Sequence, residues 1–155
     1  MDIAFKIAEI SDTDKLLQLI REFYDESGDL IFDDILTPAA LERLLMDNSL
    51  GYVWLIQQDN TAIAYFIITL GYSLEYYGRD AFIDELYIRA DYRGKGLGAR
   101  VIKLAEDFCR TIGVNALHLE VDRTNTRAQA FYRRAGFKDH DRYLMTKLIT
   151  QGKAP

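Results

Sequence analysis

The chain has 155 residues, of which 49% are hydrophobic and 28% are charged, and its formal net charge is −5. A chain of this length fits one domain, and this composition is ordinary for a soluble globular protein. The acidic balance argues against a protein that coats nucleic acid, and the single cysteine, Cys109, excludes an internal disulfide framework. Apolar neighbours at helical spacing predict a packing role for Cys109.

No segment of the sequence is typical of a leader or of a membrane span. The N-terminus begins with a strand-like pattern instead of the basic and apolar regions of a signal peptide, and no apolar run approaches the roughly 20 residues that span a bilayer. We therefore expect a cytoplasmic protein without a membrane partner. No repeat or linker divides the chain, so residues 1–150 are predicted to form a single domain and residues 151–155 a loose tail.

The first half of the chain predicts a strand, two helices and a hairpin. Alternation of apolar and polar residues indicates strands, and apolar residues at helical spacing indicate helices. Serine and threonine caps start the helices, with a proline placed where its missing N–H costs nothing. A polar turn joins the two strands of the hairpin. These elements are, in order, a strand over 2–10, helices from 11 to 28 and from 37, and strands over 52–57 and 62–70.

The second half predicts two strand–helix units and a final strand. Adjacent acids, Asp84 and Glu85, interrupt the first of these strands, and glycines end both helices. Antiparallel strands come first, and a crossover helix then makes two later strands parallel. The fold class is therefore α/β, with a mixed, mostly antiparallel sheet and about four helices. The elements are strands over 82–88, 116–121 and 143–149, and helices over 97–112 and 125–135.

A glycine-rich loop joins the strand over 82–88 to the following helix. Glycine lets a backbone approach a ligand closely, and a helix start directs free N–H groups and a positive dipole toward an anion. Between Arg89 and Lys103 there are five basic residues and one acid, in a chain that is acidic overall. This inversion predicts a polyanionic ligand such as a diphosphate, against the plainer interpretation of a connecting turn. The loop consists of Arg93, Gly94, Lys95, Gly96, Leu97, Gly98 and Ala99.

The same glycines allow a second interpretation, a dinucleotide-binding fingerprint. Gly94, Gly96 and Ala99 satisfy its spacing, and Glu120 ends the next strand, where a ribose-binding acid could sit. Against it, residues 89–93 separate the strand from the glycines, and too little chain follows for a doubly wound sheet. The phosphate-loop motif is absent, because no Gly-Lys-Ser/Thr follows at the required spacing.

Several segments carry motifs that recur together in one protein family. They are residues 84–88, 92–98, 125 and 130–137. These motifs resemble the GNAT superfamily of N-acetyltransferases, whose acetyl-CoA signature is Arg or Gln, two residues, Gly, one residue, and Gly or Ala. Arg93, Gly96 and Gly98 match that signature, and the element order agrees over nearly the whole chain. The resemblance implies a GNAT-like acyl-CoA N-acyltransferase fold with acetyl-CoA as co-substrate.

The resemblance also implies where the co-substrate lies. A bulge in the strand over 82–88 splays the parallel pair apart and opens a gap for the thioester. Backbone groups of that strand hold the pantetheine arm as an added strand would, and the glycine loop holds the diphosphate. Asn125 both caps its helix and contacts CoA. The cofactor-binding residues implied are Leu86, Tyr87, Ile88, Arg93, Gly94, Lys95, Gly96, Leu97, Gly98, Ala99, Asn125 and Tyr132.

Acetyl transfer to an amine requires a deprotonated amine and a proton for the departing thiolate. Tyr132 stands where the family places a tyrosine that serves as general acid, and its plainer interpretation is a tyrosine of the core. Asp84 and Glu85 are the candidates for general base, because an ammonium with a pKa near ~10 loses a proton before attack. We favour Glu85 over Asp84 and keep a water-mediated route and an ordinary charged strand as alternatives.

Six acids and no base lie between residues 22 and 34, which predicts a carboxylate-lined mouth that attracts a cationic acceptor. This stretch, with the resemblance to polyamine and diamine acetyltransferases, favours a small cationic amine as acceptor. A solvated acidic loop is the alternative interpretation, and a peptide N-terminus, a lysine side chain or an aminoglycoside remains open. The acids are Glu22, Asp25, Glu26, Asp29, Asp33 and Asp34.

The predicted function is an acetyl-CoA-dependent N-acetyltransferase that works by direct attack in a ternary complex, with a non-catalytic CoA-binding module as the alternative. His118 and His140 have no other metal-ligating residues near them in the sequence, so we predict no metal. Many relatives in the family form dimers, which makes the strand over 143–149 a candidate for exchange between two copies. A nucleic-acid partner is not expected.

Overall fold

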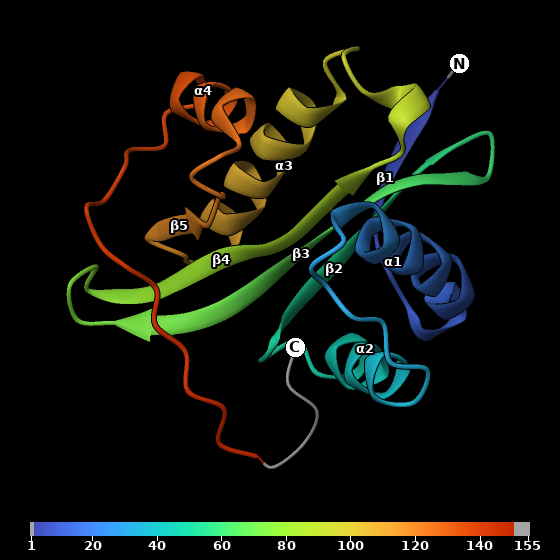
Figure 1. Ribbon diagram of the computed structural model, residues 1–155, viewed down its shortest axis with the longest axis horizontal. Coiled ribbons are helices and arrows are strands. Elements are labelled where there is room, and N and C mark those ends of the chain that lie inside the picture. The colour runs from blue at the N-terminus through green and yellow to red at the C-terminus, as the bar shows by residue number, and fades with distance from the viewer. Residues whose placement is uncertain (1, 151–155) are drawn as a thin grey trace.

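The computed structural model describes residues 2–150 and shows a central sheet with helices on both faces (Figure 1). The predicted tail at 151–155 lies outside the described residues. Two short 3-10 turns, Ile10–Asp12 and Ala90–Tyr92, precede α1 and α3. The strands are β1 (Ile3–Ile7), β2 (Gly51–Gln58), β3 (Thr61–Ser73), β4 (Gly78–Ile88) and β5 (Ala116–Leu119), and the helices are α1 (Thr13–Ser27), α2 (Leu36–Met46), α3 (Leu97–Thr111) and α4 (Thr126–Arg134).

The five strands lie in the sheet in the order in which they occur along the chain. Neighbouring strands are antiparallel from β1 to β4, whereas β4 and β5 are parallel. The parallel pair arises because α3 carries the chain back to the end at which β4 began. The mixed, mostly antiparallel sheet that the sequence predicts is therefore confirmed.

Each face of the sheet is covered by its own apolar layer. Successive strand residues point to opposite faces, so Trp54 and Phe66 pack with α3, while Leu55 and Tyr65 pack with α1 and α2. Helix α3 also buries Cys109, which confirms the packing role predicted for this residue, and burial raises the pKa of its thiol to about 11. Helix α4 packs on the α3 side, so the helices form two layers around the sheet (Figure 1).

Strand β4 contains a bulge at Asp84. On β3, Ile67 pairs with Glu85, and the next residue, Ile68, pairs with Ile83, which leaves Asp84 without a partner on that strand. The extra residue reverses the side-chain alternation, so Ile83 packs in the α3 layer while Glu85 turns to the α1 side. Strand β5 pairs with β4 only as far as Ile83. The bulge and the splayed parallel pair that the resemblance implies are therefore present.

The predicted strand over 143–149 is wrong. Residues 138–149 form neither helix nor strand, and after α4 the chain passes the β3–β4 hairpin, where Arg142 lies 3.7 Å from Glu75 (Figure 1). Its apolar side chains stay exposed, with Tyr143 at 83% and Met145 at 89%. Alternation indicates a propensity for extended backbone, but a strand must also pair with a neighbouring strand to satisfy its N–H and C=O groups, and this segment pairs with no strand among residues 2–150.

Candidate functional site

A cleft of about 390 Å³ lies where β4 and β5 have separated, between α1, β4, α4 and the first turn of α3. It brings together motifs that lie far apart in the sequence. Six of its lining residues are among those predicted as site residues, and five others complete the wall. The six are Leu86, Tyr87, Ile88, Arg93, Gly98 and Tyr132, and the five are Phe23, Glu26, Ser27, Ala128 and Phe131.

The glycine loop leads from the cleft into α3. Gly94 and Gly96 have φ of +71° and +80°, a left-handed conformation that glycine adopts without strain. No heavy atom lies within 4 Å of a Cβ built at either position, so the surface of the loop is open. Gly96 is the N-cap of α3, and no side chain caps this helix. The N–H groups of the first turn therefore point into open space, an arrangement that fits the diphosphate of CoA.

The other loop residues contribute backbone more than side chains. Ala99 is exposed beside the cleft, whereas Leu97 is buried in the α3 layer, so only its peptide group can meet a ligand. Lys95 Nζ donates to the carbonyl oxygen of Asp91 at 2.8 Å. The sequence predicts that the loop's cations present positive charge to an anion, and this stays a prediction for Lys95, whose ammonium is held by the backbone of its own loop.

Arg93 is tied to its own protein on two sides. Its Nε donates to the carbonyl oxygen of Ile88 at 2.7 Å, and its guanidinium forms a 2.6 Å ion pair with Glu26 of α1. The hydrogen bond from Arg93 holds the pKa of Glu26 below its usual range, and the same contact raises the pKa of Arg93. Arg93 therefore joins α1 to the strand that borders the cleft.

Tyr132 lies on α4 with its ring between those of Phe131 and Phe137, whose centroids are 5.2 and 5.9 Å away. Burial raises the pKa of Tyr132, so the phenol keeps its proton at neutral pH. Its hydroxyl has no hydrogen-bond partner among residues 2–150. A protonated hydroxyl that faces a cleft and is not engaged by the protein is available to a ligand.

Asn125 is the N-cap of α4, and its Oδ1 accepts a hydrogen bond from the N–H of Ala128 at 3.1 Å. The cap that the sequence predicts is thus confirmed. Asn125 does not line the cleft, whereas Ala128, one turn further along, does. Contact between Asn125 and CoA stays a prediction.

The two adjacent acids lie outside the cleft lining. Asp84 is exposed at the bulge, and Glu85 points toward α1, where its carboxylate accepts hydrogen bonds from the hydroxyls of Tyr24 at 2.6 Å and Tyr65 at 2.7 Å. Burial raises the pKa of both carboxyls, and in Glu85 the two hydroxyl donors oppose that rise. Sequence reasoning missed the two tyrosines, because each reads locally as an apolar core position and no short-range pattern links them to Glu85.

Half of the carboxylates in the acid-rich segment at 22–34 are neutralised by ion pairs within the protein. Glu22 forms a two-pronged contact with Arg89 at 2.7 and 2.8 Å, and Asp34 forms a 2.7 Å ion pair with Arg21. Asp33 accepts hydrogen bonds from two backbone N–H groups at the start of α2. With Glu26 bound to Arg93, four of the six carboxylates make contacts within the protein, and three of these contacts are ion pairs that cancel half of the charge of the predicted carboxylate-lined mouth.

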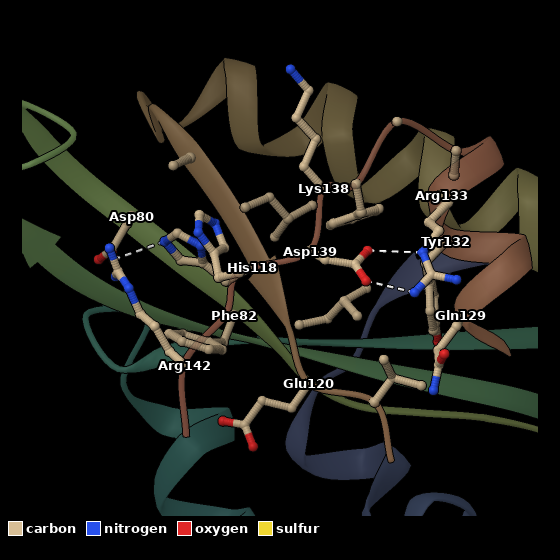
Figure 2. A pocket seen from close by; sticks show the side chains of 18 of the residues that line it. Asp80, Phe82, His118, Glu120, Gln129, Tyr132, Arg133, Lys138, Asp139 and Arg142 are labelled. Carbon is tan, nitrogen blue, oxygen red and sulfur yellow. Dashed lines mark hydrogen bonds and ion pairs between the residues drawn. The ribbon is translucent and has the colours of Figure 1, made fainter. Parts of the chain in front are cut away.

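A larger cavity of about 1460 Å³ lies along the outer side of β5 (Figure 2). Tyr132 lines this cavity as well as the cleft. Away from Tyr132, His118 Nε2 lies 3.1 Å from Asp80 Oδ2, and the Phe82 ring centroid is 5.0 Å from that of His118. Residues 138–144 close one side, so the size of the cavity depends on where the C-terminal segment lies.

Residues 2–150 offer neither a metal-ligand cluster nor a helix suited to span a membrane. Among them, no group of three or more His, Cys, Asp or Glu side chains is arranged to hold a metal ion. None of the helices in this part of the chain has the length and apolar character that a bilayer span requires.

A mixed sheet whose parallel pair separates beside an uncapped, glycine-rich helix start defines an acyl-CoA N-acyltransferase fold. Comparison with known families agrees, because the model of the Acetyltransferase (GNAT) family matches residues 13–137. The chain therefore belongs to the GNAT family of acetyltransferases.

Individual relatives are similar over different lengths. The chain is 32% identical over 76 residues to thialysine N-epsilon-acetyltransferase of Bos taurus, a match that spans 45% of each protein. An integron cassette protein from the Cole Harbour Salt Marsh metagenome has a TM-score of 0.84 at 33% identity, covering 96% of this chain and 91% of that one. A predicted acetyltransferase of Clostridium acetobutylicum, solved with acetyl-CoA, shares the fold with a TM-score of 0.80 at 19% identity, covering 96% and 97%.

Proposed function

We propose that this protein transfers the acetyl group of acetyl-CoA to a primary amine by direct attack in a ternary complex. The observation that carries the proposal is a single cleft that borders three features. These are the uncapped first turn of α3, the edge of β4 that has separated from β5, and the unengaged hydroxyl of Tyr132. Membership of the GNAT family supports the same reaction.

The three features suit the three parts of the co-substrate. Acetyl-CoA supplies an activated thioester carbonyl. The N–H groups at the start of α3 hold its diphosphate, because they are free of intrahelical partners and lie at the positive end of the helix dipole. Beyond Ile83 no strand among residues 2–150 pairs with the β5 side of β4, so backbone groups of residues 86–88 hold the pantetheine arm as a neighbouring strand would.

Tyr132 and the acid pair divide the proton transfers. Tyr132 keeps a proton on its hydroxyl and gives it to the departing sulfur, which leaves as a thiol. A carboxylate of the pair Asp84 and Glu85 takes the proton that the ammonium form of the acceptor loses. The acid step needs Tyr132 protonated at neutral pH, and the base step needs the carboxylate ionised. Burial of the phenol favours its protonated, neutral form.

The acceptor in this proposal is a small molecule with a primary amine, such as a diamine or polyamine. The similarity to a thialysine N-epsilon-acetyltransferase supports an amine at the end of a flexible chain. The acid-rich segment gives this choice less support than the sequence suggested, because three of its six carboxylates are already paired with cations. A protein or peptide acceptor is the second candidate.

The test is release of free thiol from acetyl-CoA in the presence of a panel of amines that includes spermidine, a short diamine, lysine and a peptide. We expect release with at least one small amine and none with a variant in which Gly96 and Gly98 are both replaced by valine. Tight CoA binding without thiol release for any amine would favour a non-catalytic CoA-binding module. A thermal shift with NAD instead of CoA would favour the dinucleotide interpretation.

The same proposal includes a homodimer and a cytoplasmic location. Residues 143–149 have exposed apolar side chains and no strand partner among residues 2–150. The outer edge of β5 has backbone groups that no strand among the described residues covers, so each could pair with the other. Exchange of this segment between two copies would satisfy both. Light scattering should give twice the mass of one chain, and replacement of Leu144 and Leu148 by aspartate should give a monomer. A wild-type monomer would remove this part of the proposal.

A single buried thiol is consistent with the reducing cytoplasm.

A further inference from the structure

Glu85 is held inside the protein by two tyrosine hydroxyls from different elements. Tyr24 of α1 donates to one carboxylate oxygen at 2.6 Å, and Tyr65 of β3 donates to the other at 2.7 Å. Tyr65 is fully buried, and Tyr24 packs against Phe32 and Phe23. Neither tyrosine lines the cleft or the larger cavity beside β5, so the network lies behind the cleft and not within it.

The bulge explains why a charged residue faces this layer. If β4 kept regular alternation through this point, without the bulge, Glu85 would share the face of Ile83 in the α3 layer, where no hydroxyl of α1 could reach it. A partly buried carboxylate is costly unless its oxygens are hydrogen-bonded, and here each oxygen has one short bond from a neutral donor. The two hydrogen bonds therefore fix the bulge between α1 and β3.

Asp84 differs from its neighbour in exposure and in hydrogen bonding, although burial raises the pKa of both. Its side chain is exposed at the point where β4 and β5 separate. It has no hydrogen bond or ion pair among residues 2–150, so both oxygens are open to an acceptor or to water. Glu85 has neither property, because both of its oxygens already accept a hydrogen bond.

We propose that Tyr24, Glu85 and Tyr65 form a positioning network, in which Glu85 stays a hydrogen-bonded anion while Asp84 accepts the proton of the amine. This inference rests on the proposed acetyl transfer. In that step an N–H bond of the acceptor ammonium breaks, the proton passes to an oxygen of Asp84, and the freed nitrogen lone pair attacks the thioester carbonyl. The protons of the two tyrosines remain where they are.

The charge of Glu85 then acts on Asp84 through space. The titratable groups that face Glu85 are Tyr24 from α1, Tyr65 from β3 and Asp84 from its own strand. At a pH where Glu85 is ionised, its negative charge disfavours ionisation of Asp84 and so makes Asp84 a stronger base. The same charge attracts a cationic acceptor to the bulge and adds to the attraction of the segment at 22–34, half of whose carboxylates are paired with cations.

The experiment compares pH profiles of kcat/KM for the full chain and four variants, with acetyl-CoA and the best amine of the panel. Asp84→Asn should lose at least about 100-fold in kcat, as expected for loss of a general base. Glu85→Gln should retain most of its activity but move the acidic limb of the profile to lower pH by about 0.5–1 pH unit, because the neighbouring negative charge is gone. Tyr52→Phe, far from the network on β2, is the matched control for a lost phenol hydroxyl.

Tyr65→Phe tests whether Glu85 acts on Asp84 through its negative charge or only by holding the bulge in place. Losing one donor makes the Glu85 carboxylate easier to protonate, so this variant should resemble Glu85→Gln at low pH and the wild type at high pH. If Tyr65→Phe does not fold, Tyr24→Phe carries the same expectation from the half-buried side of the network. An acidic limb that stays at the wild-type pH in Glu85→Gln would reduce the network to a structural role and overturn the inference.

Two other outcomes overturn the inference in different ways. Loss of kcat in Glu85→Gln with retention in Asp84→Asn would make Glu85 the base. A wild-type protein that releases no thiol with any amine would overturn the proposed function itself, and the inference with it. An unchanged pH profile of kcat/KM in Glu85→Gln, in an enzyme that does release thiol, would overturn the network but leave the proposed function standing.

Discussion

Gly98 on α3 faces Phe131 on α4 so closely that a Cβ built at Gly98 would lie 3.4 Å from the Cζ of the ring. The Cδ1 of Ile88 on β4 is 3.9 Å from the same position. Three elements therefore meet at the floor of the cleft, around a residue without a side chain. The distances define how large a residue this position can accept.

We predict a size series at Gly98. Alanine at 3.4 Å requires a small adjustment of the Phe131 ring and removes a glycine from a helix, so Gly98→Ala should change stability by less than about 1 kcal/mol and keep CoA affinity within a few-fold. Valine adds two methyl groups against the ring and should weaken CoA binding at least about tenfold, which corresponds to about 1.4 kcal/mol. Calorimetric titration with CoA checks both, and equal affinity for the two variants would contradict the series.

Gly96 can be tested against a glycine of the same conformation. Gly96 and Gly113 have φ of +80° and +75°, and neither has a heavy atom within 4 Å of a built Cβ. Replacing either with alanine should therefore cost a similar backbone strain of about 1 kcal/mol in unfolding free energy. Only Gly96→Ala should also weaken CoA binding, because only Gly96 caps the helix start that we assign to the diphosphate. Equal CoA affinity in the two variants would exclude that assignment.

Tyr132→Phe removes one hydroxyl and no packing volume. We expect kcat to fall about 100-fold, within the range for loss of a general acid, while CoA affinity stays within about twofold. Since burial raises the pKa of Tyr132, the wild-type kcat should not decline on the alkaline side below about pH 10. Steady-state kinetics across pH measure both, with Tyr52→Phe as control. An unchanged kcat at neutral pH would remove the acid role.

Glu85 should leave a signature in the pH dependence of stability. Its folded-state pKa lies above the reference value near ~4.3, mainly through burial, so the folded protein binds this proton more tightly than the unfolded chain does. The contribution of Glu85 to stability is then present below about pH 4.3 and is lost as pH rises through the folded pKa. Gln does not titrate, so the Tm of Glu85→Gln relative to wild type should rise between about pH 4 and pH 7.

Differential scanning calorimetry at several pH values measures this relative Tm. The exposed Glu42→Gln on α2 serves as the matched control, and its Tm difference from wild type should not follow the same trend. A relative Tm that falls with rising pH in Glu85→Gln would mean that the two tyrosines outweigh burial and that the folded pKa lies below the reference value.

Much of the fold could be predicted because the signals are local. Apolar alternation located β2 and β3, and the run from Arg93 to Gly98 marked both the loop and the start of α3. Tyr132 lines the same cleft as Arg93 and Gly98 of the loop motif, as the family resemblance implies. These features depend on spacing within a few residues of sequence.

The features that sequence reasoning missed depend on contacts across the fold. The face of Glu85 follows from a one-residue bulge at Asp84, which reverses alternation without any mark in the residues themselves. The pairing of Glu22 with Arg89 joins positions 67 residues apart, so the acid-rich segment looked unpaired in the sequence. The segment at 143–149 has the composition of a strand, but its partner edge is not a local property.

The most direct test of the central claim is a crystal structure of the protein with CoA. We expect the diphosphate to accept hydrogen bonds from backbone N–H groups of residues 96–98 and the sulfur to lie within about 3.5–4 Å of the Tyr132 hydroxyl. CoA bound in the larger cavity beside β5, or a loop that makes no contact with phosphate, would contradict it.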